Sequence, residues 1–272
     1  MTPVVPKPAA SVLLVRPAES DGPDPFEVYL IRRQKAMKFL GGFYAFPGGR
    51  VDEADASPAS LERCRGLSAD KAEAVLPSDE RPALAYWVAA VRELVEESGL
   101  LLLCHADGRP LDFADAAVAA AAERLRKGLM AAEAPWATLL AREDWYCDLG
   151  PLRYLSHFTT PTASPIRFSA RFFLCPLPTG QTPRLFTEEI SEGFWIAPVE
   201  GYRRFWRGEM AMAEPAEYGL GYLAQFASLA ELWAAHADGR HKFDGLIDRI
   251  DAFWKRFDWQ RSAWSGPPWG SP

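Results

Sequence analysis

The sequence lacks the residue patterns of several well-defined protein classes. Its four cysteines lie far apart and form no CxxC pair, and its four histidines form no HExxH motif, so neither a zinc site nor a redox pair is indicated. No apolar run approaches the length of a membrane span, and the first residues do not show the basic start and apolar core of a signal peptide. We therefore expect reduced cysteines and a cytoplasmic protein without a membrane partner.

The chain also lacks an excess of positive charge. Its formal net charge is -6, and its 272 residues are 49% hydrophobic and 24% charged. This is an ordinary globular composition that offers no broad basic surface to a nucleic acid. The length allows one large domain or two small ones, so the fold has to be predicted from the order of the elements.

The first half of the chain predicts strands followed by one strongly patterned helix. Residues 10–16 and 26–33 read as buried strands, and the short loop between them predicts antiparallel pairing. A short strand over 44–46 runs into a Pro-Gly-Gly turn, whose glycines permit close backbone approach. Apolar residues at steps of three and four from Leu84 to Val95 predict a helix that begins near Pro82 and ends at Gly99.

This helix carries three glutamates on one side. Glu93, Glu96 and Glu97 share a face because residues three and four apart are neighbours on a helix. Their charges repel one another, and a hard divalent cation with oxygen ligands would compensate them. The alternative interpretation is a solvated acidic face, which is common on surface helices.

The remaining elements are mostly helical. Two short capped helices are predicted first, one over 61–65 with Ser57 or Ser60 as the cap and one over 69–76 with Ser68 as the cap. The pattern then predicts a strand at 101–104, helices over 111–130 and 136–142, a hairpin of strands 152–160 and 167–175, and a strand ending at Ile196. The last predicted helices lie over 198–206, 218–232 and 243–257. Six tryptophans from Trp206 onward favour a packed helical appendage or a subunit interface, and a homodimer is compatible with the latter.

An ordered set of residues resembles the Nudix box. The box reads G-x5-E-x7-R-E-U-x-E-E-x-G-U, with U apolar, and Gly49, an acidic residue at Asp55 and the stretch 92–100 follow it. The helical half matches at every specified position. The loop half departs twice: Asp55 stands where the box has Glu, and 36 residues, 56–91, separate it from Arg92.

The long gap resembles one branch of that family, the coenzyme A diphosphatases with an insertion inside the box. Residues 30–49 and the segment from Thr160-Pro161 to Phe173 also look like that branch, although Ser169-Ala170 stands where it often has Asp-Thr. The resemblance implies an α/β fold, a Nudix-type α/β/α sandwich with a mixed β-sheet. It implies a Nudix domain over 8–200 with a helical insertion at 56–81, a helical C-terminal extension over 201–262 and a flexible tail over 263–272.

The resemblance also assigns roles to the box residues. Glu96 and Glu97 look like the main ligands of Mg²⁺ or Mn²⁺, and Glu93 is then a further ligand or positions water. Arg92 is expected to orient a box carboxylate through a bidentate pair rather than touch the substrate. Gly48 and Gly49 are expected to shape the loop packed against the helix and to expose backbone amides near the metal.

Two further sets of residues are candidates for the site. Arg32 and Arg33 end a predicted strand, and they either face an anionic ligand or form a solvated strand end. In the Nudix fold the segment before the strand of Trp195 often brings another carboxylate to the metal. Glu189 is favoured over Glu188 for this role, and an exposed acidic loop is the alternative.

The implied activity is metal-dependent hydrolysis of a nucleoside diphosphate derivative, a small-molecule substrate. Coenzyme A or an acyl-coenzyme A is the best match. The alternatives are ADP-ribose or another nucleotide sugar, and a non-catalytic Nudix domain that binds a nucleotide as a regulator.

Overall fold

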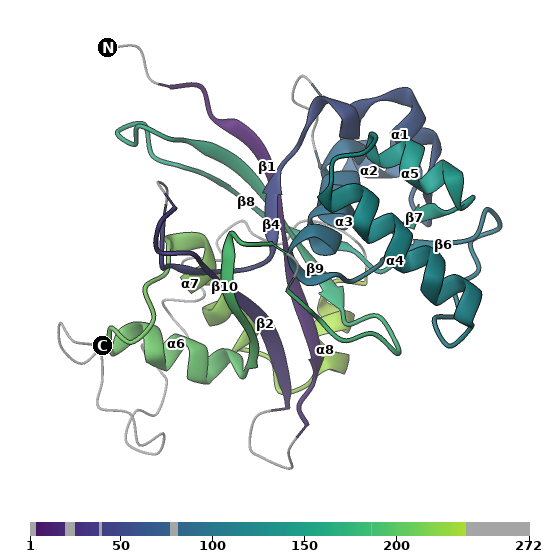
Figure 1. Cartoon of the computed structure of the whole chain (residues 1–272). Coiled ribbons are helices and arrows are strands. Elements are labelled where there is room, and N and C mark those ends of the chain that lie inside the picture. The colour runs from purple at the N-terminus through teal and green to yellow at the C-terminus, as the bar shows by residue number, and fades with distance from the viewer. Residues whose placement is uncertain (1–3, 20–24, 38–39, 77–80, 186, 238–272) are drawn as a thin grey trace. The chain divides into compact units, whose positions relative to one another are not determined.

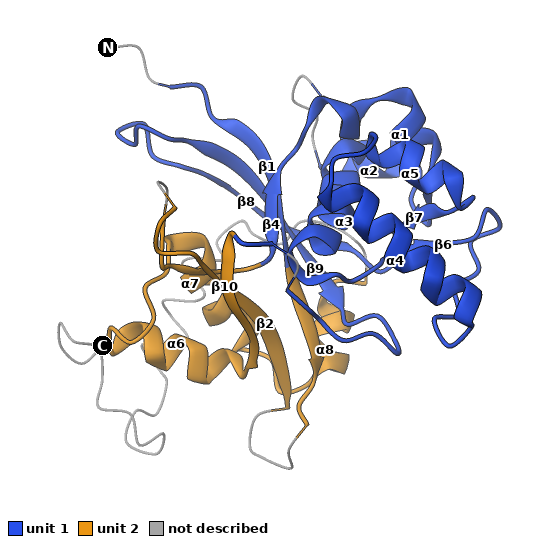
Figure 2. Ribbon diagram, viewed as in Figure 1, with its two compact units in different colours: residues 1–12, 47–188 blue, residues 13–46, 189–272 orange. Residues whose placement is uncertain are grey.

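The computed structural model describes residues 4–19, 25–37, 40–76, 81–185 and 187–237 (Figure 1). The chain divides into two compact units (Figure 2). Unit 1 contains Met1–Val12 and Pro47–Glu188, and unit 2 contains Leu13–Phe46 and Glu189–Pro272. Both units are therefore built from two separate stretches of chain. The division into domains at 8–200 and 201–262 stays a prediction.

In unit 2, antiparallel strands form the sheet. The first strand, β1 (Lys7–Pro17), begins in unit 1, and its last residues pair with β2 (Phe26–Arg33), Val15 opposite Val28. Strand β10 (Ile190–Ile196) pairs with β2, and β3 (Tyr44–Ala45) pairs with β2 as well. The predicted strands and their antiparallel order are confirmed. Strands β1 and β2 have continuous apolar runs because both of their faces are buried: all residues of Val12–Val15 and Val28–Ile31 are buried.

Unit 1 contains a hairpin and a short strand. Strands β8 (Arg153–Thr159) and β9 (Phe168–Pro176) form the predicted antiparallel hairpin, and β9 lies next to β1. Strand β4 (Gly48–Arg50) pairs with the beginning of β1, Gly49 opposite Ala10. A strand of three residues with two glycines gives almost no sequence signal, so β4 was not predicted.

Helix α3 (Leu84–Ser98) is the central helix of unit 1. Every residue in it except Glu96 is buried. Trp87 packs against Phe173 and Tyr154 of the hairpin, with ring centroids 4.8 and 6.4 Å away. Gly99 ends the helix in the left-handed conformation, as predicted. The helix begins after Ala83, two residues later than predicted, and Glu73 Oε1 accepts the free Ala83 N–H at its start.

Between the two halves of the predicted box the chain folds into small elements. These are the 3₁₀ helix η1 (Glu53–Ala56), α1 (Pro58–Glu62), β5 (Cys64–Arg65) and α2 (Ala69–Val75). The hydroxyls of Ser57 and Ser68 cap the two α-helices, so Ser57 and not Ser60 caps the first. A small mixed sheet joins β5 in parallel and β6 (Leu103–Cys104) antiparallel to β7 (Tyr146–Asp148). β5 and β7 were too short to predict.

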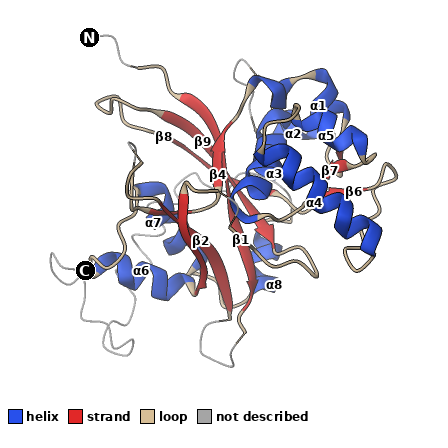
Figure 3. Cartoon of the chain, viewed as in Figure 1, coloured by secondary structure: helices blue, strands red, loops and turns tan. Residues whose placement is uncertain are grey.

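The remaining helices are drawn in Figure 3, and α5 (Trp136–Arg142) and α6 (Pro198–Trp206) agree with the pattern. Helix α4 (Ala116–Met130) begins five residues later than predicted, because the Asp115 carboxylate caps it. Helices α5 and α6 have the predicted bounds. The predicted helix over 218–232 is wrong: α7 (Glu214–Leu223) ends and α8 (Leu229–Ala235) begins anew, with Ser228 as its cap.

Two predictions on the C-terminal part lie outside the described residues, the helix over 243–257 and the flexible tail. Within the part of the chain that the structure describes, no helix has the length and apolar character needed to cross a membrane.

Candidate active site

Arg92 lies at the centre of a buried charge cluster in unit 1. Its Nε and Nη2 donate to the two carboxylate oxygens of Asp55, both at 3.0 Å, which is a bidentate pair. Its Nη1 donates to Oε1 of Glu93 and of Glu96, both at 2.9 Å. The predicted bidentate contact of Arg92 with a box carboxylate is present. One guanidinium therefore holds three acidic side chains in fixed positions.

Asp55 joins the loop half of the motif to the helical half. Helix η1 places it opposite Arg92, and only 1% of its surface is exposed. Its Oδ2 also accepts the Asp52 N–H at 2.9 Å. The shorter Asp side chain reaches Arg92 because η1 is packed against α3. The insertion thus separates Asp55 from Arg92 in the sequence but not in space.

The electrostatics of the cluster follow from burial and from these contacts. Burial opposes the charge of Arg92, but the hydrogen bond to Asp55 and the charges of Glu93, Asp55 and Glu96 raise the pKa of Arg92 above its ordinary value. Burial raises the pKa of Glu93 to about 7, although the charge of Arg92 acts in the opposite direction. A cation at this position would oppose the rise in the pKa of Glu93 by favouring its charged form.

Two glycines bring β4 into direct contact with α3. The Gly48 N–H donates to Glu97 Oε2 at 2.6 Å. A Cβ on Gly49 would lie 2.5 Å from the Glu93 carboxylate. Gly48 has φ +153°, and a Cβ there would lie 2.3 Å from the Ala10 carbonyl oxygen. The loop packing predicted for this pair is present, and the Gly48 amide points at a box carboxylate.

The three glutamates offer suitable donor chemistry for a hard divalent cation. Carboxylate oxygens from one rigid helix are the ligands that Mg²⁺ and Mn²⁺ prefer. As they lie, Glu93 and Glu96 share Arg92, and Glu97 contacts Gly48. In the described ranges, no three His, Cys, Asp or Glu side chains are already arranged around a common point for a metal. The donor types match the predicted ion, and the ligand set stays a prediction.

The other predicted site residues belong to unit 2. The Arg32 guanidinium lies over the Tyr44 ring, 5.1 Å from its centroid, and 3.9 Å from Glu192. The Nε of Arg33 is buried and makes no hydrogen bond within the described part of the chain. Glu189 is exposed, and its carbonyl accepts the Gln34 N–H. The part of Arg32, Arg33 and Glu189 in the site stays a prediction, as does the choice between Glu189 and Glu188.

Two members of the cluster were missed from the sequence. The Arg50 carbonyl accepts from Arg92 Nη2 at 2.8 Å, and Asp52 Oδ2 lies 3.8 Å from the same atom. Every residue has a backbone carbonyl, so the sequence cannot indicate that the one of Arg50 contacts Arg92. Asp52 stands three residues before Asp55, so its acidic character was the only available signal.

Comparisons with known proteins identify relatives of this chain. No family model matches the sequence. The acyl-coenzyme A diphosphatase NUDT19 of Gallus gallus is 31% identical, over 85% of this chain and 71% of that protein. The protein of the same name from Homo sapiens is 27% identical, over 80% of this chain. This chain spans 64% of the length of the human relative.

A solved structure shows the same fold. The crystal structure of a Nudix hydrolase from Alicyclobacillus acidocaldarius superimposes with a TM-score of 0.70 and 30% sequence identity. The match covers 85% of this chain and 96% of that one.

Proposed function

This chain belongs to the Nudix hydrolase family, and we propose that it hydrolyses the diphosphate linkage of coenzyme A or an acyl-coenzyme A. The observation that carries the proposal is the Asp55–Arg92 pair, which rejoins the two halves of the box across the insertion. The glutamates that the box requires then lie together on α3. The names of the chicken and human relatives support this choice of substrate.

In this proposal Glu96 and Glu97 are the main ligands of a Mg²⁺ or Mn²⁺ ion. The ion would neutralise the charge of the substrate's diphosphate and so make it open to attack. Glu93 is a third ligand or positions the attacking water. Arg92 does not touch the substrate: it fixes the orientation of Glu93 and Glu96, whose carboxylates it contacts directly. Gly48 keeps Glu97 in place through its N–H.

The proposed products are a phosphopantetheine and an adenosine bisphosphate. The test is a chromatographic screen for the cleavage products with Mg²⁺ and with Mn²⁺ over coenzyme A, ADP-ribose, NADH and dinucleoside polyphosphates, since cleavage of these diphosphate linkages releases no free phosphate. Coenzyme A or its thioesters should give the highest kcat/KM. Preference for ADP-ribose would instead favour a nucleotide-sugar diphosphatase, and tight binding without hydrolysis would favour a regulatory domain.

A single variant tests the assigned machinery. Glu97→Gln keeps the acceptor for the Gly48 N–H but removes a charged ligand, so turnover should be abolished while the melting temperature stays close to that of the wild type. Wild-type activity in this variant would contradict the assignment.

We further propose a cytoplasmic location and a small-molecule nucleotide as the partner. All four cysteines are free and buried in the described chain, which is consistent with a reducing compartment. The homodimer is proposed from the tryptophan-rich end alone, and sedimentation of the purified protein would test it.

A further inference from the structure

A buried hydroxyl joins the first helix of the insertion to η1. Ser60 of α1 is 2% exposed, and its Oγ donates to the Ala54 carbonyl at 2.6 Å. The Ser57 Oγ donates to the same carbonyl at 2.8 Å, from an exposed position. Because Ser60 stands six residues after Ala54, its hydrogen bond connects two separate elements and belongs to neither helix ladder.

The carbonyl that Ser60 contacts belongs to the peptide group of Asp55. The Ala54 carbonyl and the Asp55 N–H are parts of one planar unit, because the peptide bond between them does not rotate freely. The Asp55 carboxylate in turn accepts from Arg92 and from the Asp52 N–H. A hydrogen bond that fixes this peptide plane therefore restricts the direction in which the Asp55 side chain leaves the backbone.

Helix α1 is itself attached to the small sheet. Strand β5 follows α1 directly and pairs in parallel with β7. The Cζ atoms of Arg63 and Arg65 lie 4.9 and 3.9 Å from the centroid of the Tyr146 ring. A guanidinium over an aromatic ring is a favourable contact. Helix α1 also contacts α3, so Ser60 reaches η1 from an element that is held on several sides.

We propose that Ser60 is a positioning residue for the catalytic cluster. Through η1 it holds Asp55 in the orientation that the bidentate pair with Arg92 requires. Arg92 then orients Glu93 and Glu96. The inference rests on the proposed function, since it assigns the cluster its catalytic role. It gives the insertion a part in aligning the box besides connecting its two halves.

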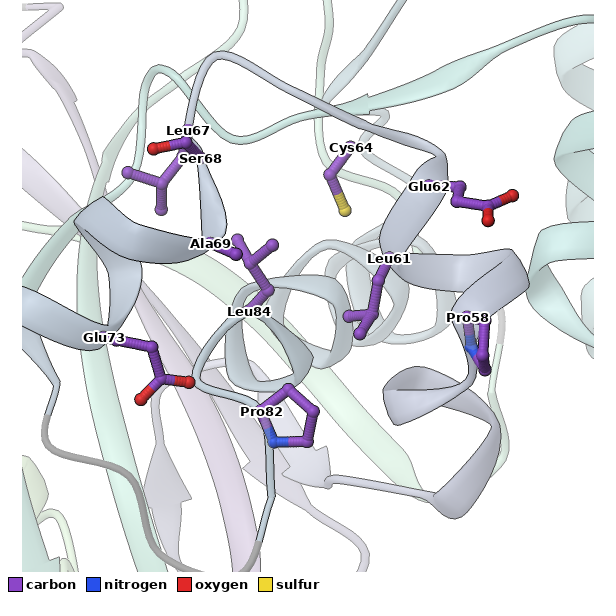
Figure 4. Close-up of a pocket in the computed structure, with 10 residues that line it drawn as sticks. All are labelled: Pro58, Leu61, Glu62, Cys64, Leu67, Ser68, Ala69, Glu73, Pro82 and Leu84. Carbon is purple, nitrogen blue, oxygen red and sulfur yellow. The ribbon is translucent and has the colours of Figure 1, made fainter.

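The alternative is a structural role, in which loss of the Ser60 hydroxyl lowers stability alone. Ser68→Ala is the matched control, since it removes the hydroxyl that caps α2 in the same insertion. Among the described residues, the Ser68 Oγ accepts the Lys71 N–H and makes no contact with η1. Ser68 lies across a hollow of about 410 Å³ from Pro58 and Leu61 of α1 (Figure 4).

Steady-state kinetics with coenzyme A and Mg²⁺ give the first test. Ser60→Ala should lower kcat by about 10-fold or more and change KM by less than about twofold, because misalignment weakens the transition state more than substrate binding. Ser60→Cys nearly keeps the volume and weakens the donor, so it should give an intermediate kcat and replaces Ser60→Ala if that variant does not fold. Ser68→Ala should keep both constants of the wild type. Equal kcat values in Ser60→Ala and Ser68→Ala would overturn the inference.

A double-mutant cycle with Asp55→Asn shows whether Ser60 acts through Asp55. Asp55→Asn keeps the shape of the side chain and removes its charge. In that background Ser60→Ala should lower kcat by less than about twofold, because the effects of residues that act through one another do not add. An undiminished effect of Ser60→Ala in the Asp55→Asn protein would overturn the inference.

Hydrogen exchange in the metal-free protein tests Ser60 without relying on hydrolysis. Nuclear magnetic resonance follows the Arg92 Nε–H, which donates to Asp55, and the backbone N–H of Leu94 in the buried middle of α3. Ser60→Ala should speed exchange at Arg92 by about tenfold or more relative to Leu94, because a local opening does not require unfolding. Equal acceleration at both positions would show a loss of stability alone and would overturn the inference. If the wild type hydrolyses none of the screened compounds, the proposed function fails and this measurement alone decides the role of Ser60.

Discussion

A single buried guanidinium organises the acidic residues of unit 1. Arg92 contacts Asp55, Glu93 and Glu96 with hydrogen bonds of 2.9 to 3.0 Å and is itself 7% exposed. Burying a charge is tolerated only when its partners are present. Removing Asp55 would leave Arg92 without its bidentate partner, although Glu93 and Glu96 remain in contact with it. Removing Arg92 would leave several carboxylates in mutual repulsion.

Asp55→Ala should destabilise the fold by about 3 to 5 kcal/mol, because it leaves the charge of Arg92 buried without its bidentate partner. Urea denaturation of the metal-free protein measures the change in the free energy of unfolding. Asp52→Ala is the control, since the Asp52 side chain is 61% exposed and 3.8 Å from Arg92. Asp52 also caps η1, so the control should cost about 0.5 to 2 kcal/mol. Equal effects of the two substitutions would contradict the structural role of Asp55.

The raised pKa of Glu93 predicts a pH dependence of stability in the metal-free protein. Its pKa is about 7 in the fold against 4.5 ordinarily, so between these values the folded chain holds a proton that the unfolded chain releases. Stability from this group is complete below pH 4.5 and is lost as pH rises through 7, by no more than about 3 kcal/mol. The amide of Glu93→Gln does not titrate, so this variant lacks the pH-dependent contribution of Glu93. Melting temperatures in EDTA should therefore show a steeper decline from pH 5 to 8 in wild type than in Glu93→Gln, and parallel profiles would refute the shift.

At the scale of elements, the contact between β4 and α3 sets the geometry of the site. The Gly48 N–H of β4 donates to the Glu97 carboxylate of α3. Gly49 has no side chain, and this leaves room for the Glu93 carboxylate. Every residue of α3 except Glu96 is buried, and the helix ends at Gly99. The position of the glutamates relative to the loop is therefore determined by backbone packing and not by flexible side chains.

Gly49→Ala should reduce kcat by about 100-fold or more and lower the stability by about 1 to 3 kcal/mol. The added Cβ would lie 2.5 Å from the Glu93 carboxylate, which must move and give up its place on Arg92. Steady-state kinetics and a thermal melt measure the two effects. Gly180→Ala is the control, because nothing lies within 4 Å of its added Cβ, although its φ of +72° costs about 1 kcal/mol. Full activity in Gly49→Ala would contradict the close packing.

Sequence reasoning succeeded where one element carries its own pattern. Helix α3, its cap at Gly99 and the glutamates on it follow from periodicity, and α5 and α6 have the predicted bounds. It failed for β4, β5 and β7, since two or three residues cannot show a period. The burial of Glu93 was also missed, because it depends on β4 and η1, which are distant in the sequence. Local composition did not reveal the helix break at Ser228.

At the scale of the whole molecule, the chain leaves unit 1 and returns to it. Residues 13–46 belong to unit 2 together with everything from Glu189 onward. Within unit 2, β10 covers an edge of β2 with six paired positions from Ile190 to Ile196. The box lies entirely in unit 1, but the chain that enters it has to pass through β2 and β3.

A fragment of residues 1–188 should therefore not fold cooperatively, although it contains the whole box. It leaves the edge of β2 unpaired and exposes Leu30 and Ile31, which are buried in the complete chain. Circular dichroism should show a broad thermal transition or aggregation, in contrast to the full chain. A sharp melt with retained hydrolysis would show that unit 1 does not need β10.

The Asp55–Arg92 pair has a consequence for how such proteins can diverge. The pair closes over an intervening stretch of 36 residues, so the proposed chemistry depends on the return of Asp55 to Arg92 and not on the number of residues between them. Lengthening this excursion costs little, since closure entropy grows only with the logarithm of loop length. This stretch can therefore change in length while the Asp55–Arg92 pair stays in place.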